Sequence, residues 1–471
     1  ATGTYLRGRI ILGETIYDSG PNGQRPAMAL SDSLRAVGLK LMRFKTGTPA
    51  RIDRRSIDFA KTSMQEGDPS APAFSFLTEE MPAEQTPCWL TYTNEETHAV
   101  IRANLHRAPM ANGVIEGVGP LYCPSVETKI ARFPDKERHQ LFLEPEGLHT
   151  NEMYVQGMST SLPTDVQEEF LTTIPGLEHA RIMRPGYAIE YDCLDPLQLE
   201  ATLAVKGIAG LYSAGQSNGT SGYEEAAAQG LIAGINAARK IAGEEPLILK
   251  RSEAYIGVLI DDLVTKGTQE PYRMMTSRAE YRLLLRQDNA DLRLTEHGRR
   301  VGLVTDERWA RFTKKKDEID SALSALRETV LTPSVAVNEK LRAAGLGEIH
   351  VVTSLFALLR RPAAQYETLR AFFSLPQISK EAVREVDVTT SYEGYIAKQQ
   401  EDVRRQERLE NRLLPEDMDY GQVPSLRDEA REKLAALRPR SVGQAGRISG
   451  VSPADISLLL VWLERARRRH G

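Results

Sequence analysis

Residues 211–238 constrain the fold more than any other stretch of the chain. An apolar run at 210–214 leads into a segment rich in Gly, Ser, Asn and Thr, which is followed by a run of mostly small residues. The small residues that recur at helical spacing are Ala226, Gly230, Ala233, Gly234 and Ala237. Small residues on one face let a helix backbone approach a sheet or a ligand closely. The stretch therefore predicts a strand, a glycine-rich turn and a helix within an α/β domain.

The start of this helix bears on what the turn can bind. Ser221 and Glu224 have the spacing of a capping box, so we expect the helix to begin there. Backbone amides at a helix start attract negative charge, but Glu224 and Glu225 already occupy the first turn. A pyrophosphate therefore fits poorly, and a redox ring that becomes anionic when reduced fits better. A turn with a purely structural role is equally compatible with the pattern.

The composition excludes several classes of protein. The 471 residues suffice for roughly two to four domains, and 60 Lys and Arg against 64 Asp and Glu give a net charge of -4. Any nucleic-acid surface must therefore be a local patch. Cys88, Cys123 and Cys193 form no even framework, and no window approaches the roughly 18 apolar residues of a membrane span. We expect a soluble, cytoplasmic protein with no membrane segment and, because the His residues are scattered, no metal site.

The first 45 residues predict a fold that is entered part-way. Residues 1–13 suggest one strand, a turn and a second strand, and Ser31–Val37 suggests a short helix that ends at Gly38. An exposed, unpaired first strand would be an unusual natural start. We therefore expect a further segment to precede Ala1.

A basic loop and an insertion follow. Lys45, Arg51 and Arg54 stand among Gly and Thr, a mixture that suits phosphate contacts, although a solvated basic loop has the same composition. Residues 60–113 are rich in Pro, Thr and Glu with short alternating runs, which predicts a small β-rich insertion. Beyond it, 141–150 and 153–157 have the pattern of paired strands.

Cys123 is the cysteine with the most suggestive surroundings. It precedes Pro124, a residue favoured at the first position of a helix, and Lys129 and Arg132 follow. A helix start and nearby cations both favour the thiolate, whereas a buried, inert cysteine is the commoner alternative.

The C-terminal half is predicted to be helical after a boundary at 243–246. Arg278, Arg282 and Arg286 recur every four residues, which predicts one face of a helix, either for nucleic acid or simply solvated. Further helices are expected between Pro333, Pro362 and Pro376, then a long charged helix at 394–412 and a helix start at 452–455.

Five ordered motifs resemble the MnmG (GidA) family of FAD-dependent tRNA uridine 5-carboxymethylaminomethyl modification enzymes. The two longest are Gly119-Pro-Leu-Tyr-Cys-Pro-Ser-Val-Glu-Thr-Lys129 and Ala214-Gly-Gln-Ser-Asn-Gly-Thr-Ser-Gly-Tyr-Glu-Glu-Ala226. The other three are Thr46-Gly-Thr-Pro49, Ser277-Arg-Ala-Glu-Tyr-Arg-Leu283 and Tyr392-Glu-Gly-Tyr-Ile396. The resemblance covers essentially the whole chain. The family's opening Gly-x-Gly-x-x-Gly turn and its second catalytic cysteine have no counterpart in this sequence.

The resemblance implies a fold and its division into domains. The fold would be an α/β FAD-binding domain, Rossmann-like and of the glutathione-reductase type, with a small β-rich insertion and an all-α C-terminal region. The expected parts are the FAD-binding domain at 1–45 and 116–243, the insertion at 46–115, and helical domains at 244–390 and 391–471.

The resemblance also implies site residues. Cys123 matches a catalytic cysteine. The residues expected to bind FAD or NADH are Gly119, Pro120, Tyr122, Pro124, Ser125, Glu127, Lys129, Phe133, Gly215, Gln216, Asn218, Gly219, Thr220, Gly222, Tyr223 and Glu224. The residues expected to bind tRNA are Lys45, Arg51, Arg54, Arg278, Arg282 and Arg286.

The implied activity adds a carboxymethylaminomethyl or aminomethyl group to C5 of the wobble uridine of tRNA. NADH would keep the flavin reduced, and methylenetetrahydrofolate would reach the reaction through the partner GTPase MnmE. A homodimer that joins MnmE in a heterotetramer is expected. Two alternatives stay open: a folate- and FAD-dependent tRNA uridine methyltransferase like TrmFO, and a non-catalytic fragment that binds tRNA or the GTPase.

Overall fold

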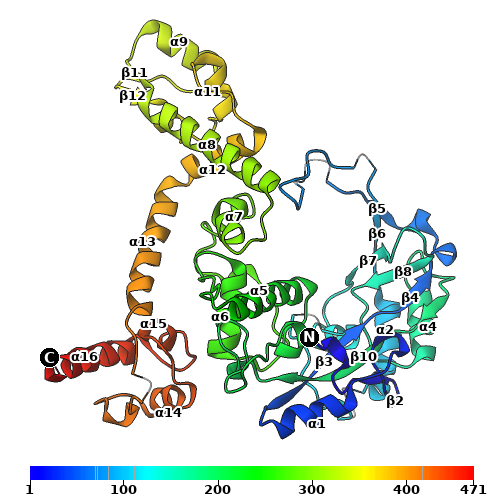
Figure 1. The fold of residues 1–471 in the computed structure, drawn as a ribbon. Helices are drawn as coiled ribbons and strands as arrows, with labels where there is room; N and C mark the ends of the chain where they lie inside the picture. Colours follow the sequence, from blue (N-terminus) through cyan, green and yellow to red (C-terminus); the bar gives the residue numbers. More distant parts are fainter. Residues whose placement is uncertain are drawn as a thin grey trace. The chain divides into compact units, whose positions relative to one another are not determined.

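The computed structural model describes residues 1–68, 71, 73–82, 84–109, 113–122, 124–415 and 417–470, without the side chains of 466–470 (Figure 1). The chain divides into two compact units. The first takes Ala1–Leu247 with Gly267–Met274, and the second takes Ile248–Lys266 with Met275–Gly471. A mixed α/β region followed by helices, as predicted, is confirmed.

The first unit contains a four-stranded sheet. Its order is β2 (Thr15–Asp18), β1 (Arg9–Leu12), β10 (Tyr187–Leu194) and β3 (Leu41–Thr48), with every neighbour antiparallel. β10 is buried along almost its whole length because it has a strand on each side. α1 (Met28–Ala36) contains most of the predicted helix and is followed by Gly38 at φ 88°.

The strand pair predicted within residues 1–13 is only partly right. Gly3–Tyr5 forms a 3-10 turn, and β1 pairs instead with β2, which lies beyond Gly13. The reason is local, since Gly3 and Arg7 both take a positive φ and interrupt an extended chain.

A six-stranded sheet forms the second layer of the first unit. Its order is β5 (Ser63–Gln65), β6 (Cys88–Tyr92), β7 (Gln140–Pro145), β8 (Glu152–Gln156), β4 (Arg51–Asp53) and β9 (Ile182–Arg184). The strands of the β-rich stretch thus share a sheet with strands from 140–184. The predicted pairing of 141–150 with 153–157 is confirmed as β7 with β8. Their alternating burial turns Leu141, Leu143 and Val155 toward one core.

Three helices pack onto that core. They are α2 (Glu95–Ala103), α3 (Val126–Arg132) and α4 (Thr164–Thr172) (Figure 1). Ile101, Ile130 and Phe170 are their fully buried contributions. α2 begins with a capping box between Asn94 and Thr97, which fixes its first turn.

Residues 211–238, the stretch that most constrains the fold, contain a turn and a helix but no strand. The predicted strand at 210–214 is wrong, because only a single bridge joins Tyr212 to Ala204. The turn is η7 (Gly215–Asn218), and the helix is α5 (Tyr223–Ala242). α5 ends at Gly243, which takes the left-handed conformation that favours glycine.

The second unit is almost entirely helical. Its longer helices are α6 (Tyr255–Lys266), α7 (Ala290–Arg300), α8 (Asp306–Glu328), α9 (Val335–Ala343), α12 (Lys380–Ser391), α13 (Glu393–Glu410), α14 (Asp428–Leu437) and α16 (Pro453–His470). Shorter pieces are β11 (Val330–Leu331), β12 (Thr353–Ser354), α10 (Leu355–Leu359), α11 (Tyr366–Phe372) and α15 (Val442–Ala445). Pro333, Pro362 and Pro376 lie between helices as predicted. The predicted start at 452–455 is confirmed, since Ser452 and Asp455 exchange backbone and side-chain hydrogen bonds.

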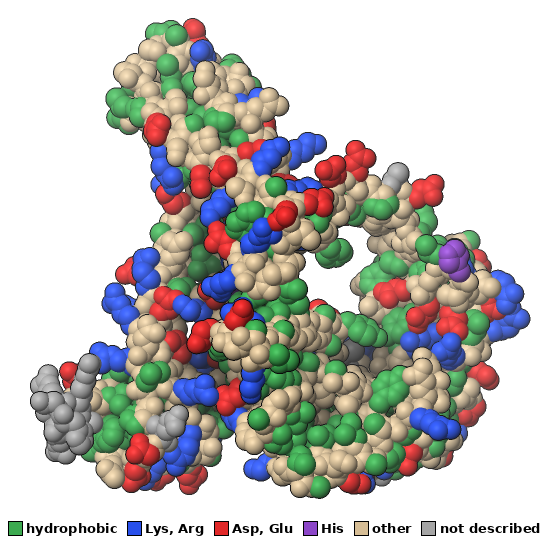
Figure 2. Space-filling view, in the orientation of Figure 1, with side chains coloured by type: hydrophobic (Ala, Val, Ile, Leu, Met, Phe, Trp, Pro, Cys, Tyr) green, Lys and Arg blue, Asp and Glu red, His purple; other side chains and the backbone are tan. Residues whose placement is uncertain are grey.

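Charged side chains of both signs are interspersed over the face of the molecule shown in Figure 2. The distribution accords with the near balance of 60 basic and 64 acidic residues.

Candidate functional site

The candidate site is centred on the turn between η7 and α5. Gly219 takes φ 82°, and a Cβ there would lie 3.0 Å from the Thr268 methyl and 3.1 Å from the Phe44 ring. The conformation therefore favours glycine, and a methyl group there would press against both side chains. Phe44 belongs to β3, and Thr268 belongs to residues 267–274, which we call the strap. β3 and the strap thus hold the turn between them.

Buried amides brace the turn from within. Asn218 is fully buried and donates to the Ser213 carbonyl at 2.8 Å and to Gln229 Oε1 at 2.8 Å. Gln229 in turn donates to Thr220 Oγ1 at 3.0 Å. The Oδ1 of Asn218 is buried and accepts no hydrogen bond from the residues that the structure describes. Asn218 and Thr220, which the sequence predicts as cofactor-binding, thus also hold the shape of the turn.

The predicted capping box at the start of α5 is wrong. Gly222 is the N-cap, and no side chain caps the helix. The Ser221 amide donates to the Tyr272 carbonyl at 3.1 Å, and Glu224 accepts from Arg273 at 2.8 Å. The strap thus occupies the groups that the capping box would have used.

Glu225, rather than Glu224, is the buried carboxylate of the first turn. Its Oε1 accepts from the Met274 amide at 2.7 Å and lies 3.4 Å from Arg273 Nε. Its Oε2 occupies the place that a Cβ on Gly222 would take, and has no hydrogen-bond partner within the described part of the chain. Gly222 is therefore required by this carboxylate. The sequence offered no signal that separates Glu225 from Glu224.

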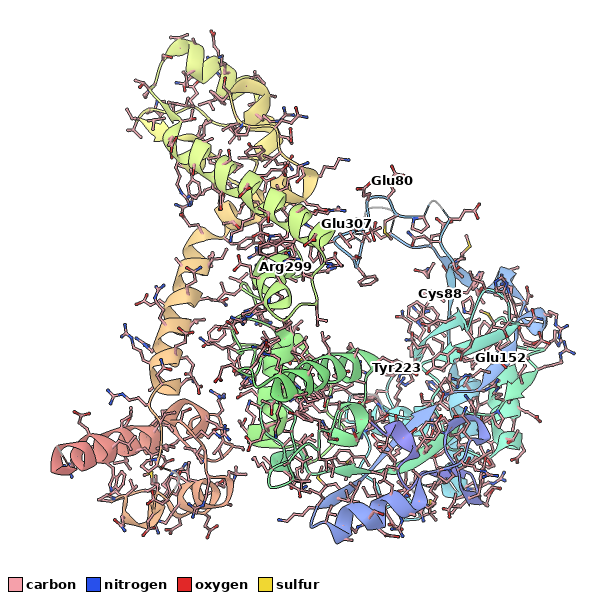
Figure 3. All side chains as sticks on the ribbon, in the orientation of Figure 1. Glu80, Cys88, Glu152, Tyr223, Arg299 and Glu307 are labelled. Carbon is pink, nitrogen blue, oxygen red and sulfur yellow. The ribbon has the colours of Figure 1, made fainter. Side chains whose placement is uncertain are left out.

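The Gly119 motif is held by the same two segments as the turn. The Lys45 amide donates to the Val118 carbonyl at 3.0 Å, which ties the motif to β3. The Leu121 amide donates to Glu270 Oε2 at 2.9 Å, which ties it to the strap. Leu121 and Tyr122 remain 56% and 66% exposed. The structure thus brings Gly119–Tyr122 and Gly219–Tyr223 together, and Tyr223 is 95% exposed at the start of α5 (Figure 3).

The rest of the Gly119 motif, residues 124–129, leads into α3 and contacts the segment that follows β8 of the six-stranded sheet. Ser125 is the N-cap of α3, so Pro124 does not take the first helical position predicted for it. Glu127 is buried and accepts from the Ser161 amide and hydroxyl, each at 3.1 Å. Lys129 donates to the Gly157 carbonyl at 2.9 Å. These contacts fix α3, while Phe133 beyond it stays exposed.

Cys123 lies outside the described residues. Of the other two cysteines, Cys88 is half-buried on β6 and Cys193 is fully buried on β10. Burial raises the pKa of the Cys193 thiol well above its usual range, and the nearby carboxylates of Asp192 and Asp195 act in the same direction. Cys193 is therefore unsuited to act as a thiolate.

Gln216 lies near a buried group on β10, the Tyr191 hydroxyl. The Tyr191 hydroxyl is buried and makes no hydrogen bond of good geometry among the described residues. Burial raises the pKa of Tyr191 well above its usual range, and the nearby Gln216 side chain offsets part of that rise.

The predicted basic loop is wrong, because Lys45 lies on β3 and Arg51 begins β4, and its cations differ in their surroundings. Lys45 is buried beside Gly119. Arg51 forms an ion pair with Glu146 at 2.6 Å, and its guanidinium carbon lies 4.7 Å from the Tyr154 ring centroid. Arg54 is exposed and lies 5.5 Å from the Trp89 ring centroid.

The predicted arginine helix is wrong. Only Thr276–Arg278 forms a 3-10 turn, and no helix covers residues 279–289. Arg251, which is buried, donates to the Arg278 carbonyl at 3.1 Å and to Glu280 at 2.8 Å, so these groups serve a tertiary contact instead of a helix. Arg286 pairs with Glu385 at 2.7 Å. Arg282 is exposed.

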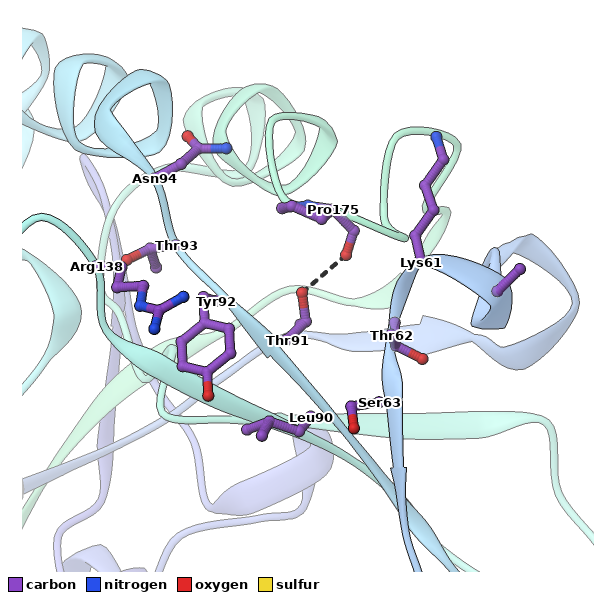
Figure 4. Close-up of a pocket in the computed structure, with 11 residues that line it drawn as sticks. Lys61, Thr62, Ser63, Leu90, Thr91, Tyr92, Thr93, Asn94, Arg138 and Pro175 are labelled. Atoms are coloured by element: carbon purple, nitrogen blue, oxygen red, sulfur yellow. Dashed lines mark hydrogen bonds between the residues drawn. The ribbon is translucent and has the colours of Figure 1, made fainter.

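A shallow pocket of about 500 Å³ lies over β5 and β6 (Figure 4). Several of its hydroxyls are engaged internally, as when Thr91 donates to the Pro175 carbonyl at 2.8 Å. Arg138 lies 4.2 Å from the Tyr92 ring centroid. The sequence did not point to this pocket, because its residues come from separate segments.

Two features are absent from the residues that the structure describes. In that part of the chain, no three His, Cys, Asp or Glu side chains gather in a way that would hold a metal ion. Among its helices, none is both long and apolar enough to cross a membrane.

Comparison with known proteins identifies the family. Residues 1–245 match the family model Glucose inhibited division protein A. Residues 306–400 match the tRNA modifying enzyme MnmG/GidA C-terminal helical domain, and 402–471 match its C-terminal helical bundle. The fold and the two converging motifs define a member of a family of tRNA-modifying enzymes. The chain belongs to the MnmG/GidA family.

Individual relatives agree over nearly the whole chain. The tRNA uridine 5-carboxymethylaminomethyl modification enzyme MnmG of Caldicellulosiruptor saccharolyticus is 59% identical over 469 residues, which are 99% of this chain and 75% of that protein. The Geobacillus kaustophilus protein of the same name is 55% identical over 467 residues, 99% of this chain and 74% of that one. A solved structure of Aquifex aeolicus GidA matches with a TM-score of 0.86 and 44% identity, over 98% of this chain and 74% of that chain.

Proposed function

We propose that this chain modifies C5 of the wobble uridine of tRNA, adding a carboxymethylaminomethyl or aminomethyl group. Family membership and the names of its relatives support the reaction class. The structural observation that carries the proposal is the meeting of the Gly119 and Gly219 motifs on β3 and the strap. We keep 1–45 with 116–243 as the cofactor-binding part, 46–115 as the insertion, and 244–390 and 391–471 as helical domains.

The turn fits a flavin better than a free phosphate. Glycines at 219 and 222 let the turn pack closely against Phe44, Thr268 and Glu225, and Glu225 places a buried negative charge at the helix start. A flat ring is compatible with this carboxylate, whereas a pyrophosphate would be repelled by it. We assign Gly215, Gln216, Gly219, Gly222, Tyr223 and Glu224 to the flavin, with Asn218 and Thr220 shaping the turn. FAD, when bound, supplies the redox chemistry.

The exposed Gly119–Tyr122 loop fits a nicotinamide donor. Leu121 and Tyr122 present apolar surface beside the turn, and the loop backbone is fixed at Val118 and Leu121. An exposed aromatic ring on a fixed backbone can stack against a planar ligand. We assign Gly119, Pro120 and Tyr122 to NADH.

Cys123 is the cysteine that we assign to the uridine. Cys193 is buried with a raised pKa, and Cys88 lies on a strand of the insertion sheet. Attack by a thiolate at C6 of a pyrimidine makes C5 more nucleophilic, which divides a difficult substitution into easier steps. A proton-transfer role for Cys123 is the alternative, and a Cys123→Ser protein with full activity would exclude both.

The remaining partners follow from the proposed reaction. We propose that the exposed Arg54 and Arg282 contact tRNA, and that the protein acts in the cytoplasm as a homodimer joined to the GTPase MnmE. Methylenetetrahydrofolate supplies the carbon unit through that partner, and glycine or ammonium supplies the amine.

Nucleoside analysis of modified tRNA tests the proposal. The purified chain is incubated with tRNA, FAD, NADH, methylenetetrahydrofolate, glycine, GTP and an MnmE-type GTPase, and the tRNA is then digested for mass spectrometry. We expect a carboxymethylaminomethyl adduct of uridine that needs every component. Formation of 5-methyluridine would instead assign the chain to folate-dependent methylation, and unmodified uridine would favour a binding role without catalysis.

A further inference from the structure

Glu190 is a fully buried carboxylate at the centre of the four-stranded sheet. It lies on β10, in register with Arg9 on β1 and Lys45 on β3. Its side chain is 0% exposed, and Oε2 accepts from Arg9 at 3.0 Å through Nε and 2.5 Å through Nη2. Arg43 Nη2 lies 3.7 Å away. A carboxylate with this degree of burial needs hydrogen bonds to each oxygen.

The second oxygen of Glu190 holds a loop rather than the sheet. Oε1 accepts from the Gly117 backbone amide at 2.5 Å. Arg9 continues the connection, because its Nη2 also donates to the Val114 carbonyl at 3.2 Å and reaches Glu116 at 3.3 Å. The Arg9–Glu190 pair thus holds residues 114–117 at three points: Val114, Glu116 and Gly117.

The loop lies in backbone contact with β3 at this position. A Cβ on Gly117 would stand 2.7 Å from the Phe44 carbonyl carbon and 2.8 Å from its oxygen. The Val118 amide donates to the Arg43 carbonyl at 3.3 Å. Residue 117 has no side chain to secure the loop, so the hydrogen bond from its amide to the buried Glu190 adds to the backbone bonds that Val118 makes with β3.

We propose that Glu190 is a positioning residue that fixes the Gly119–Tyr122 loop through the Gly117 amide. Residues 117–122 are continuous, so an anchor at Gly117 sets where Gly119 and Tyr122 stand relative to β3. The catalytic consequence rests on the proposed function, in which this loop receives NADH. The anchoring itself does not.

Three variants of the full chain separate anchoring from general stability. Glu190→Ala removes both hydrogen-bonding oxygens, and Glu190→Gln keeps an oxygen for the Gly117 amide without the charge. Glu116→Gln is the matched control, because Glu116 also reaches Arg9 but is 69% exposed and does not bond Gly117. Hydrogen exchange is measured on peptides covering 113–122 and, for comparison, 187–194 of β10.

Exchange in 113–122 is expected to accelerate about 100-fold in Glu190→Ala and about tenfold in Glu190→Gln, since bonds to charged acceptors exceed neutral ones. Glu116→Gln should stay within about twofold of the wild type. Exchange in 187–194 should change much less than in the loop. If Glu190→Ala does not fold, the exchange rates of Glu190→Gln and Glu116→Gln in 113–122 test the proposal.

Equal protection of 113–122 in wild type and Glu190→Gln, or equal acceleration of the loop and β10, would overturn the proposal. The KM for NADH provides the catalytic readout. It is expected to rise in Glu190→Gln with a smaller change in kcat. If the wild type oxidises no NADH, the proposed function fails, while the exchange data still decide the role of Glu190.

Discussion

Replacing Glu225 with alanine tests whether its carboxylate holds the strap against the start of α5. The carboxylate is 1% exposed and accepts from the Met274 amide at 2.7 Å. A hydrogen bond to a charged group contributes about 1.5–3 kcal/mol, and its loss leaves the half-buried Met274 amide without this acceptor. For a unit of this size, each 1 kcal/mol lowers the unfolding midpoint by about 2–4 °C. Glu225→Ala should therefore lower the midpoint by about 3–12 °C.

Glu224→Ala is the matched control, since it removes the same charge from the same turn. Its side chain is 64% exposed and pairs with Arg273 at the surface, a contribution of about 0–1 kcal/mol. Scanning calorimetry of both variants should show a small shift for Glu224→Ala and a large one for Glu225→Ala. Equal shifts would refute the claim that Glu225 fastens the strap.

Three further predictions concern other parts of the chain. Arg251→Met should destabilise the helical unit by about 1.5–3 kcal/mol in urea unfolding, because the buried Asp262 carboxylate loses one cation and keeps its pair with Lys266 at 2.7 Å. Arg299→Ala at an exposed pair should cost under about 1 kcal/mol. Burial lowers the pKa of His98 and His139 below the ordinary 6.5, so these side chains accept protons less readily in the folded protein than in the unfolded chain. The free energy of unfolding should therefore keep its full value above pH 6.5 and fall as the pH drops below it. Calorimetry between pH 7 and pH 5 should show a flatter decline for a variant with both histidines changed to glutamine. Arg54→Ala should reduce the salt dependence of tRNA binding, measured by fluorescence anisotropy, by a slope of about 1, and an unchanged slope would remove Arg54 from the interface.

The elements that the sequence predicted well are those with local causes. The start of α16 follows from the reciprocal hydrogen bonds of Ser452 and Asp455, which lie three residues apart. The pairing of β7 with β8 follows from alternating side chains and a short connection. Five motifs in order were enough to predict the family, and one of them contains Gly219, whose positive φ favours glycine.

The elements that it missed depend on distant partners. The arginine repeat at 278–286 has helical spacing, but Arg251 draws the Arg278 carbonyl and the Glu280 carboxylate into a tertiary network. The Ser221 capping box fails because the strap, some 50 residues later, takes the Ser221 amide. In the sequence alone, Glu190 looks like an exposed residue of a strand, because its partner Arg9 lies 181 residues away. Local patterns contain no information about such partners.

Flavin binding tests the central claim, that the turn at 215–222 is the centre of the site. FAD is titrated into the purified chain and into two variants, with flavin absorbance and fluorescence as the readouts and circular dichroism as the check on folding. In Gly219→Ala the new methyl meets Phe44 and Thr268 at φ 82°, whereas in Gly230→Ala, on α5, it meets open space. The account predicts that the wild type and Gly230→Ala bind FAD and that Gly219→Ala binds it at least about tenfold more weakly. A wild-type chain that binds no flavin, or a folded Gly219→Ala that binds it equally well, would contradict the claim.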